Sequence, residues 1–303
     1  MAMVPFIGAE AVESGRVNRY QLATRHDAVF RNVYVPKGHD VTAVDKALAA
    51  WLWSGRSATV AGLSAAALLG SRWIDAREPA ELFHASRHPT PGIMLHSDRL
   101  ADDEVQVVDG VRTTTPARTG FDLGRRKGLT NAVIRLDALM QATDVKGHDI
   151  AALSERHPGA RGVVQLREAI GLSDAGAESP QETRTRLVLT AADLRPTQTQ
   201  IVVLDELDHF VGRIDMGWDE WLVGVEYDGI QHWTDPEQRR RDIDRIAEFE
   251  ALGWRIVRVG ADMLRYRPGT IVARTRAALV AAGWPDGAPN VNYRSRFPRN
   301  VKR

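Results

Sequence analysis

The sequence predicts an α/β protein whose N-terminal part is α+β, and three observations support this class. Apolar residues at helical spacing alternate with short apolar strand segments along the chain. From residue 178 to residue 284 the elements follow the order α-β-β-β-α-β-α, which gives a sandwich with a central mixed sheet. The segment GLSDAGAESP before them has the composition of a linker, so more than one domain is expected.

The region before this linker is predicted to consist of short helices and strands. Val44, Leu48 and Trp51 recur at helical spacing, and Ser54-Gly55 ends their helix. Thr115 precedes Pro116, the arrangement of an N-cap followed by proline in the first turn. The predicted elements are a strand around 30–36, helices at 41–53 and 60–69, strands and loops over 71–115, and helices from 116, at 131–143 and around 166–170.

The region after the linker is predicted element by element. The elements are a helix at 179–194, a strand at 199–205, a hairpin of 210–218 with 221–228, a helix at 236–252, a strand at 255–259 and a helix at 271–282. We take Asp219 and Glu220 as a two-residue hairpin turn. In that register Asp215 lies opposite Gly224, with Glu226 one diagonal step away.

Composition sets limits on partners and compartment. A formal net charge of +1 identifies no partner, and the absence of cysteine removes disulfides and thiolate metal sites and agrees with a reducing compartment. Apolar runs stay short of the roughly 18 residues of a membrane helix, so we expect a cytoplasmic protein without a membrane partner. Isolated histidines at 84, 88 and 96 lack metal-ligand spacing and are interpreted as surface or structural residues.

The predicted hairpin carries the strongest candidate for chemistry. Asp215 and Glu226 fall on one face of the sheet, in otherwise apolar sequence. Carboxylates gathered on a half-buried face repel each other unless a cation lies between them. Oxygen ligands select a hard ion, so Mg²⁺ or Mn²⁺ is the expected metal, with Asp215 and Glu226 as its ligands. Such an ion activates water and stabilises charge on a phosphoryl oxygen, which is nuclease chemistry.

Several neighbours of this pair have two readings each. Asp228 shares the face of Glu226 but precedes Gly229, so it either joins the site or shapes a turn. Glu182 is either an accessory acid or the returning member of a capping box that begins at Ser179. Basic residues beside the acids either hold nucleic-acid phosphates or belong to a solvated surface of ion pairs; they are Arg239, Arg240, Arg241 and Arg245.

The C-terminal motifs resemble a known family. SPQET, RIDMGW, VGVEYDGIQH, DIDR and GWRIVRV are similar, in order and spacing, to bacterial domains related to very-short-patch-repair endonucleases, within the PD-(D/E)xK superfamily. The resemblance implies a restriction-endonuclease-like fold, DNA as substrate, and Asp215 and Glu226 as metal ligands. It also implies catalytic roles for Glu182 and His232. Asp228 stands where the superfamily motif has lysine, so His232 or Arg245 would have to replace that lysine.

The preceding region resembles another family. TTTPARTGFDLGRR and RLDALMQAT are similar to AbiEi-type antitoxins of type IV toxin–antitoxin systems. Such proteins begin with a winged helix whose recognition helix enters the DNA major groove. Only seven residues separate Leu22 from Phe30, too few for that helix, so the segment is expected to be degenerate. The predicted domains are the winged-helix-like segment 1–55, the AbiEi-like middle domain 56–172, the endonuclease-like domain 173–285 and a basic, disordered tail 286–303.

These observations support three functional hypotheses. The first is a divalent-metal-dependent DNA endonuclease in repair or defence. The second is a non-catalytic, nucleic-acid-binding regulator of the type IV antitoxin class, and the third is a structural or interaction protein with a decayed site. DNA is the expected partner in the first two, no small-molecule cofactor is expected, and the sequence does not indicate the oligomeric state.

Overall fold

The computed structural model describes residues 4–85, 88, 90–126, 128–229 and 236–285, without the side chains of 236–239 and 241–243. The described chain divides into two compact units, residues 1–170 and residues 171–303. The division falls at Gly171, the first residue of the GLSDAGAESP segment. His232 and the predicted tail at 286–303 lie outside the described residues.

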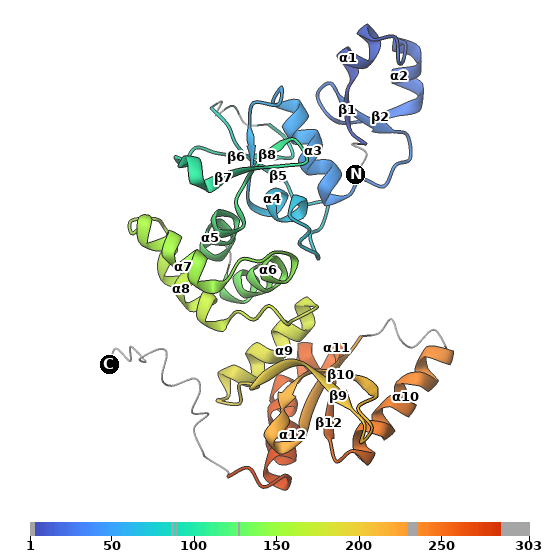
Figure 1. The fold of residues 1–303 in the computed structure, drawn as a ribbon. Coiled ribbons are helices and arrows are strands. Elements are labelled where there is room, and N and C mark those ends of the chain that lie inside the picture. The colour runs from blue at the N-terminus through green and yellow to red at the C-terminus, as the bar shows by residue number, and fades with distance from the viewer. Residues whose placement is uncertain (1–3, 86–87, 89, 127, 230–235, 286–303) are drawn as a thin grey trace. The chain divides into compact units, whose positions relative to one another are not determined.

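The first unit begins with two short helices and a hairpin (Figure 1). Its elements are β1 (Phe6–Ile7), α1 (Gly8–Glu13), α2 (Arg19–Arg25), β2 (His26–Phe30) and β3 (Val33–Pro36). The strands form one antiparallel sheet in the order β1-β3-β2. Helix α2 begins at Arg19, upstream of Leu22, so a seven-residue helix precedes the hairpin although the segment between Leu22 and Phe30 is too short to hold it.

A five-stranded sheet follows, in the order β6-β5-β4-β8-β7. Its elements and their helices are α3 (Ala43–Trp53), β4 (Thr59–Val60), α4 (Gly62–Leu68), β5 (Ala80–Phe83), β6 (Ile93–His96), β7 (Val105–Val108) and β8 (Val111–Thr114). Thr42 and Asp45 form a capping box at the start of α3, which fixes where that helix begins. Helix α3 contacts the N-terminal hairpin and β5, so one apolar core joins Phe30 and Val33 to the larger sheet.

Four helices complete this unit. They are α5 (Pro116–Arg126), α6 (Leu129–Ala142), α7 (Gly147–Arg156) and α8 (Val163–Leu172). The Oγ1 atom of Thr115 accepts a hydrogen bond from the backbone N–H of Arg118 at 3.3 Å, so the predicted cap of α5 is confirmed. Gly120 and Gly124 lie where a Cβ would collide with Ile150 and Leu166, so their small size lets α5 pack closely against neighbouring side chains.

The second unit has the predicted order α-β-β-β-α-β-α, with one short helix added. Its elements are α9 (Pro180–Ala191), β9 (Gln198–Leu204), β10 (Phe210–Trp218), β11 (Val223–Asp228), α10 (Pro236–Ala251), β12 (Arg255–Gly260), α11 (Ala261–Tyr266) and α12 (Pro268–Ala281). The sheet order is β12-β11-β10-β9, parallel between β11 and β12 and antiparallel elsewhere. The predicted mixed sheet is therefore found, and both units are mixed α and β.

Helices cover both faces of this sheet (Figure 1). Helices α9 and α12 contact β10, β11 and β12, and a core that includes Met216, Val225 and Leu279 fills that side. Helix α10 contacts β10 and β12, and a core with Ile214 and Phe249 fills the other side. None of the helices in the described ranges is both long and apolar enough to cross a membrane.

The turn of the β10–β11 hairpin differs from the predicted one. Trp218 pairs with Val223, so four residues make the connection instead of two. A 3-10 turn at Asp219–Trp221 is followed by Leu222 at φ +48, which the sequence pattern did not indicate. The predicted pairing of Asp215 with Gly224 is therefore wrong, because Gly224 pairs with Gly217. The register moves by two residues, an even step, so the paired residues Met216–Trp218 and Val223–Val225 keep their predicted faces.

Candidate functional site

The two predicted metal ligands meet where strands β10 and β11 separate. The hairpin register pairs Met216 with Val225, and one further step places Asp215 opposite Glu226. At that step the backbone N–H of Tyr227 donates to the Oδ2 atom of Asp215 at 2.7 Å. A side-chain carboxylate thus satisfies a backbone N–H of β11 at the end of the paired stretch.

The backbone is distorted around Asp215. Ile214 and Met216 belong to the cores on opposite sides of the sheet, although residues two apart in a regular strand share a face. Gln200, which the β9–β10 register places opposite Asp215, has φ +54 in the middle of a strand. Left-handed backbone at a non-glycine residue is unfavourable, and inside a strand it marks a local distortion of the sheet. The distortion holds Asp215 at the junction of both layers.

Three acidic side chains near this point of the sheet affect one another's pKa values. Glu226 is 7% exposed and Glu182 is 8% exposed. Burial raises the pKa of Asp215 to about 6, and the negative charge of Glu226 contributes to the rise. Burial also raises the pKa of Glu182 to about 7, with a contribution from Asp215. Asp215, Glu226 and Glu182 therefore lie close enough to influence one another's ionisation, and we call these three residues the acidic junction.

Glu182 lies in the first turn of helix α9, and its carboxylate is held by hydrogen bonds. The Oγ atom of Ser179 accepts from the backbone N–H of Glu182 at 3.2 Å, which caps helix α9. The Oε2 atom of Glu182 accepts from the backbone N–H of Glu178 at 2.9 Å and from Nε2 of Gln200 at 3.0 Å. The returning hydrogen bond reaches Glu178 instead of Ser179. Ser179 is therefore the cap, the predicted capping box is incomplete, and the Glu182 carboxylate is close enough to Asp215 for that charge to raise its pKa.

The other predicted site residues lie farther from the pair or have partners of their own. Asp228 forms an ion pair with Arg258 of β12. The Nη2 atom of Arg245 lies 3.4 Å from Oε2 of Glu226, so this arginine contacts the acid. Arg240 is exposed on α10, whereas the side chains of Arg239 and Arg241, like the whole of His232, lie outside the described residues.

The donor chemistry of this junction suits a hard cation. Asp215 and Glu226 have carboxylate oxygens, which hard divalent ions prefer as ligands. The two carboxylates repel each other, and a bound divalent ion would reduce that repulsion. Among the described side chains, no group of three or more Asp, Glu, His or Cys converges on one point as a complete set of metal ligands. Asp215 and Glu226 could therefore supply two ligands to such an ion, and water or substrate oxygens would have to complete its coordination.

A separate exposed surface lies at the start of the chain, and sequence reasoning missed it. Helix α2 has no buried residue, and Tyr20 on it is 76% exposed. Asn18 and Gln21 form a capping box at its start, a spacing that could have revealed the helix in the sequence. The β2–β3 hairpin follows at once, with Arg31 and Asn32 as its two-residue tip.

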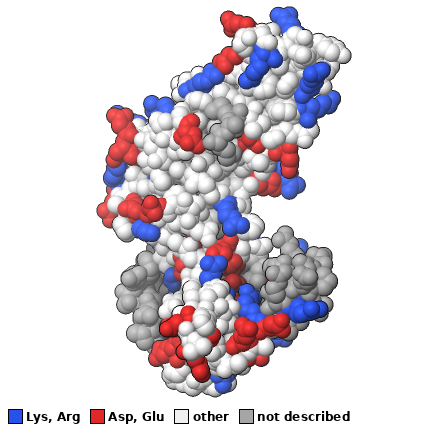
Figure 2. Space-filling view, turned by 45° about the vertical axis from the view of Figure 1, so that its right-hand side comes forward, with Lys and Arg blue, Asp and Glu red and all other residues white. Residues whose placement is uncertain are grey.

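This helix and hairpin form a basic surface. Between residues 14 and 37 the basic side chains, all exposed, are Arg16, Arg19, Arg25, Arg31 and Lys37, against one acid, Asp27. Figure 2 shows Lys and Arg side chains gathered over the end of the first unit that carries α1 and α2. We call α2 and the β2–β3 hairpin, residues 19–36, the helix–hairpin surface.

Sequence comparisons place the chain among known proteins. A model of the AbiEi antitoxin C-terminal domain matches residues 59–172. Two Mycobacterium tuberculosis proteins, Uncharacterized protein MT2308 (strain CDC 1551 / Oshkosh) and Uncharacterized protein Rv2248 (strain ATCC 25618 / H37Rv), are each 30% identical over 186 residues, 61% of this chain and 68% of each relative. The chain belongs to the family of these mycobacterial proteins, and its resemblance to AbiEi antitoxins is confirmed for residues 59–172.

Proposed function

We propose that the protein is a DNA-binding regulator of the AbiEi antitoxin class. The exposed helix–hairpin surface carries this proposal, and the AbiEi match at 59–172 supports the class. Two helices followed by a hairpin is the order of a helix-turn-helix module with a wing. A helix without buried residues at the surface of a folded unit is available to enter a groove of DNA.

In this proposal α2 and the hairpin have different tasks. Arg19 and Tyr20, at the start of α2, point to solvent and would contact base edges or the adjoining phosphates. Arg25 at the end of α2 and Arg31 at the hairpin tip would contact phosphates. The core shared by Phe30, Val33 and α3 fixes the hairpin to the rest of the unit, so the surface is presented rigidly.

The proposal is tested by selecting duplexes from a random-sequence DNA library with the full chain. Fluorescence anisotropy then measures the affinity for an enriched duplex. We expect Arg19→Ala and Arg25→Ala each to weaken binding by about tenfold, because each removes a contact worth about 1–3 kcal/mol. Arg167→Ala is the control, since Arg167 is an exposed arginine on α8. Failure to enrich any duplex, or equal affinities for all variants, would exclude the proposal.

The acidic junction supports a second candidate function, a metal-dependent DNA endonuclease. The specific observation is the pair of buried Glu226 and half-buried Asp215 at a distorted strand junction, coupled electrostatically to Glu182. The order α-β-β-β-α-β-α and the mixed sheet suit the resemblance to very-short-patch-repair endonucleases and the restriction-endonuclease-like fold that it implies. Asp215 and Glu226 would hold Mg²⁺ or Mn²⁺, which when bound activates water and stabilises phosphoryl charge.

The side chains around the pair would position the reacting groups. Arg245, next to Glu226, is placed to contact a phosphate and is the described residue best able to replace the missing motif lysine. Glu182, with its raised pKa, can hold a proton near neutral pH and transfer it. Asp228 is held by Arg258, which removes it from the role of that lysine.

Nicking of supercoiled plasmid in Mg²⁺ or Mn²⁺ tests the second candidate. Asp215→Ala and Glu226→Ala are expected to reduce nicking by at least about a hundredfold, because each removes a metal ligand. Glu220→Ala, which changes an exposed acid in the same hairpin, should retain full activity. No nicking by the unsubstituted chain, together with DNA binding that persists in EDTA, would leave the regulator as the function.

A further inference from the structure

A cavity in the first unit has no role in either proposed function. It has a volume of about 880 Å³, within the range of small-molecule sites. Its walls come from the loop at 98–102, helix α5 and the loop at 157–161, all inside the region that matches the AbiEi antitoxin domain. The lining residues are Asp98, Arg99, Leu100, Ala101, Asp102, Arg118, Phe121, Arg125, His157, Pro158, Gly159, Ala160 and Arg161.

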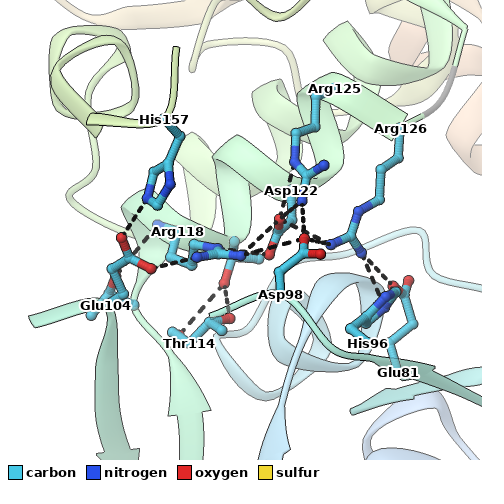
Figure 3. Close-up of polar contacts among 12 residues, drawn as sticks. Glu81, His96, Asp98, Glu104, Thr114, Arg118, Asp122, Arg125, Arg126 and His157 are labelled. Carbon is cyan, nitrogen blue, oxygen red and sulfur yellow. Dashed lines mark hydrogen bonds and ion pairs between the residues drawn. The ribbon is translucent and has the colours of Figure 1, made fainter. Parts of the chain in front are cut away.

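The floor of the cavity is an ordered network of charges (Figure 3). Arg118 is 1% exposed; its Nε atom donates to Asp122 at 3.0 Å, and its guanidinium also pairs with Glu104. The Nη2 atom of Arg125 lies 2.7 Å from Asp98 and 2.8 Å from Asp122. Each inner arginine is thus neutralised by carboxylates, and its side chain is fixed in place.

The loop at 157–161 is also held rigidly. The Nε2 atom of His157 lies 2.7 Å from Oε1 of Glu104. Gly162, which ends the loop, has φ +87, and a Cβ there would lie 2.1 Å from the carbonyl oxygen of Arg125. Glycine is therefore required for the close contact with α5. The cavity is built on fixed walls and does not depend on the loop folding around a ligand.

Two exposed arginines of the cavity lining, which we call the mouth arginines, carry positive charge. Arg99 and Arg161 are exposed, and within the described residues neither guanidinium has an ion pair. Glu104, Asp122 and Asp98 offset the arginines of the floor, so Arg99 and Arg161, against one further exposed acid of the lining, Asp102, leave a net positive charge at the cavity. Guanidinium groups bind phosphate oxygens in pairs of hydrogen bonds.

We propose that this cavity binds a nucleoside phosphate. Its phosphates would pair with Arg99 and Arg161, and the apolar wall formed by Leu100 and Pro158 would contact the base. The volume exceeds what a bare phosphate needs, which favours a ligand with an organic part. This ligand goes beyond the sequence-based expectation of no small-molecule cofactor, and it does not depend on DNA binding or nuclease activity.

Isothermal titration calorimetry of the full chain tests the cavity with ATP, GTP, AMP, inorganic phosphate and adenosine. We expect at least one nucleotide to bind, and Arg99→Ala and Arg161→Ala each to weaken it about tenfold. Arg112→Ala, on an exposed arginine of β8, should bind as the unsubstituted chain does. Adenosine should bind at least about tenfold more weakly, because it lacks the phosphate.

Three results would overturn this proposal. The first is absence of binding by all three nucleotides in the unsubstituted chain. The second is nucleotide binding that both mouth variants leave unchanged, which would place the ligand elsewhere. The third is binding of inorganic phosphate as tight as that of any nucleotide. If Arg99→Ala and Arg161→Ala weaken binding of a DNA duplex while no nucleotide binds, these arginines contact nucleic-acid backbone instead.

Discussion

At the scale of single residues, Asp215 and Glu182 lower the stability of the fold at neutral pH. Glu182 is buried, Asp215 is half-buried, and both have raised pKa values, which means that ionising them in the folded state is unfavourable. Asp215 also accepts a hydrogen bond from the Tyr227 N–H, a structural role that a neutral amide could fill. These two properties can be separated by substitution.

Asp215→Asn should make stability less dependent on pH. The folded pKa of Asp215, about 6, lies above its ordinary 3.8, so between these values the folded state holds a proton that the unfolded state has released. Stability therefore falls as pH rises from about 4 to about 7, by up to about 3 kcal/mol for this group. The asparagine variant should be more stable than the unsubstituted chain at pH 8 and equal to it at pH 4, measured by chemical denaturation.

The control for this prediction is Asp219→Asn, an exposed acid in the same hairpin, which should leave the pH profile unchanged. Millimolar Mg²⁺ at pH 8 should raise the melting temperature of the unsubstituted chain and not that of Asp215→Asn. Equal pH profiles for Asp215→Asn and the unsubstituted chain would contradict the burial of an ionisable Asp215.

Individual residues also show where sequence reasoning reached its limit. The alternation of side chains predicted that Asp215 and Glu226 share a face, and the observed register, extended one step beyond the Met216–Val225 pair, brings the two residues opposite each other. The roles of Asp228 and Arg245 could not be fixed, because their partners, Arg258 and Glu226, lie 30 and 19 residues away in sequence. The Arg118–Asp122 pair has the i, i+4 spacing of a helical ion pair, but its burial depends on Glu104 and could not be read locally.

At the scale of elements, local signals placed most helices and strands. The α3 and α5 helices have caps at Thr42 and Thr115 that can be read directly from the sequence. The conformation of the β10–β11 turn could not be predicted from the sequence, because Leu222 adopts a left-handed conformation that its residue type disfavours. Helix α2 has no apolar stripe because it buries no residue, so only the Asn18–Gln21 capping box marks its start in the sequence.

The contact between the 157–161 loop and α5 leads to an element-scale prediction. Gly162→Ala should destabilise the first unit by at least about 1–3 kcal/mol, because it combines left-handed backbone with a collision against the Arg125 carbonyl. Gly159→Ala is the matched control in the same loop, since its Cβ would meet no atom within 4 Å. Its stability should stay within about 0.5 kcal/mol of the unsubstituted chain.

Chemical denaturation of both glycine variants measures this difference. If Gly162→Ala and Gly159→Ala had the same free energy of unfolding, the close approach of the loop to α5 would be wrong. The argument that the 157–161 loop is a fixed wall of the cavity would then fail, whereas the proposal for the helix–hairpin surface would be unaffected.

At the scale of the whole molecule, the two units carry different candidate chemistry. Residues 1–170 contain the exposed helix–hairpin surface and the match to the AbiEi antitoxin domain. Residues 171–303 contain the acidic junction. The composition of the linker revealed the change between these regions, because its Gly, Ala and Ser residues interrupt both helical and strand periodicity. Sequence patterns could not decide which unit engages DNA, since exposure of α2 depends on tertiary packing.

The most direct test of DNA binding by the helix–hairpin surface is amide hydrogen exchange of the full chain, with and without a duplex enriched by selection. DNA should slow exchange in residues 19–36, which form this surface, and the protection should be lost in the Arg19→Ala variant. Protection confined to residues 171–285, with exchange at 19–36 unchanged, would contradict DNA binding by the first unit and favour the acidic junction.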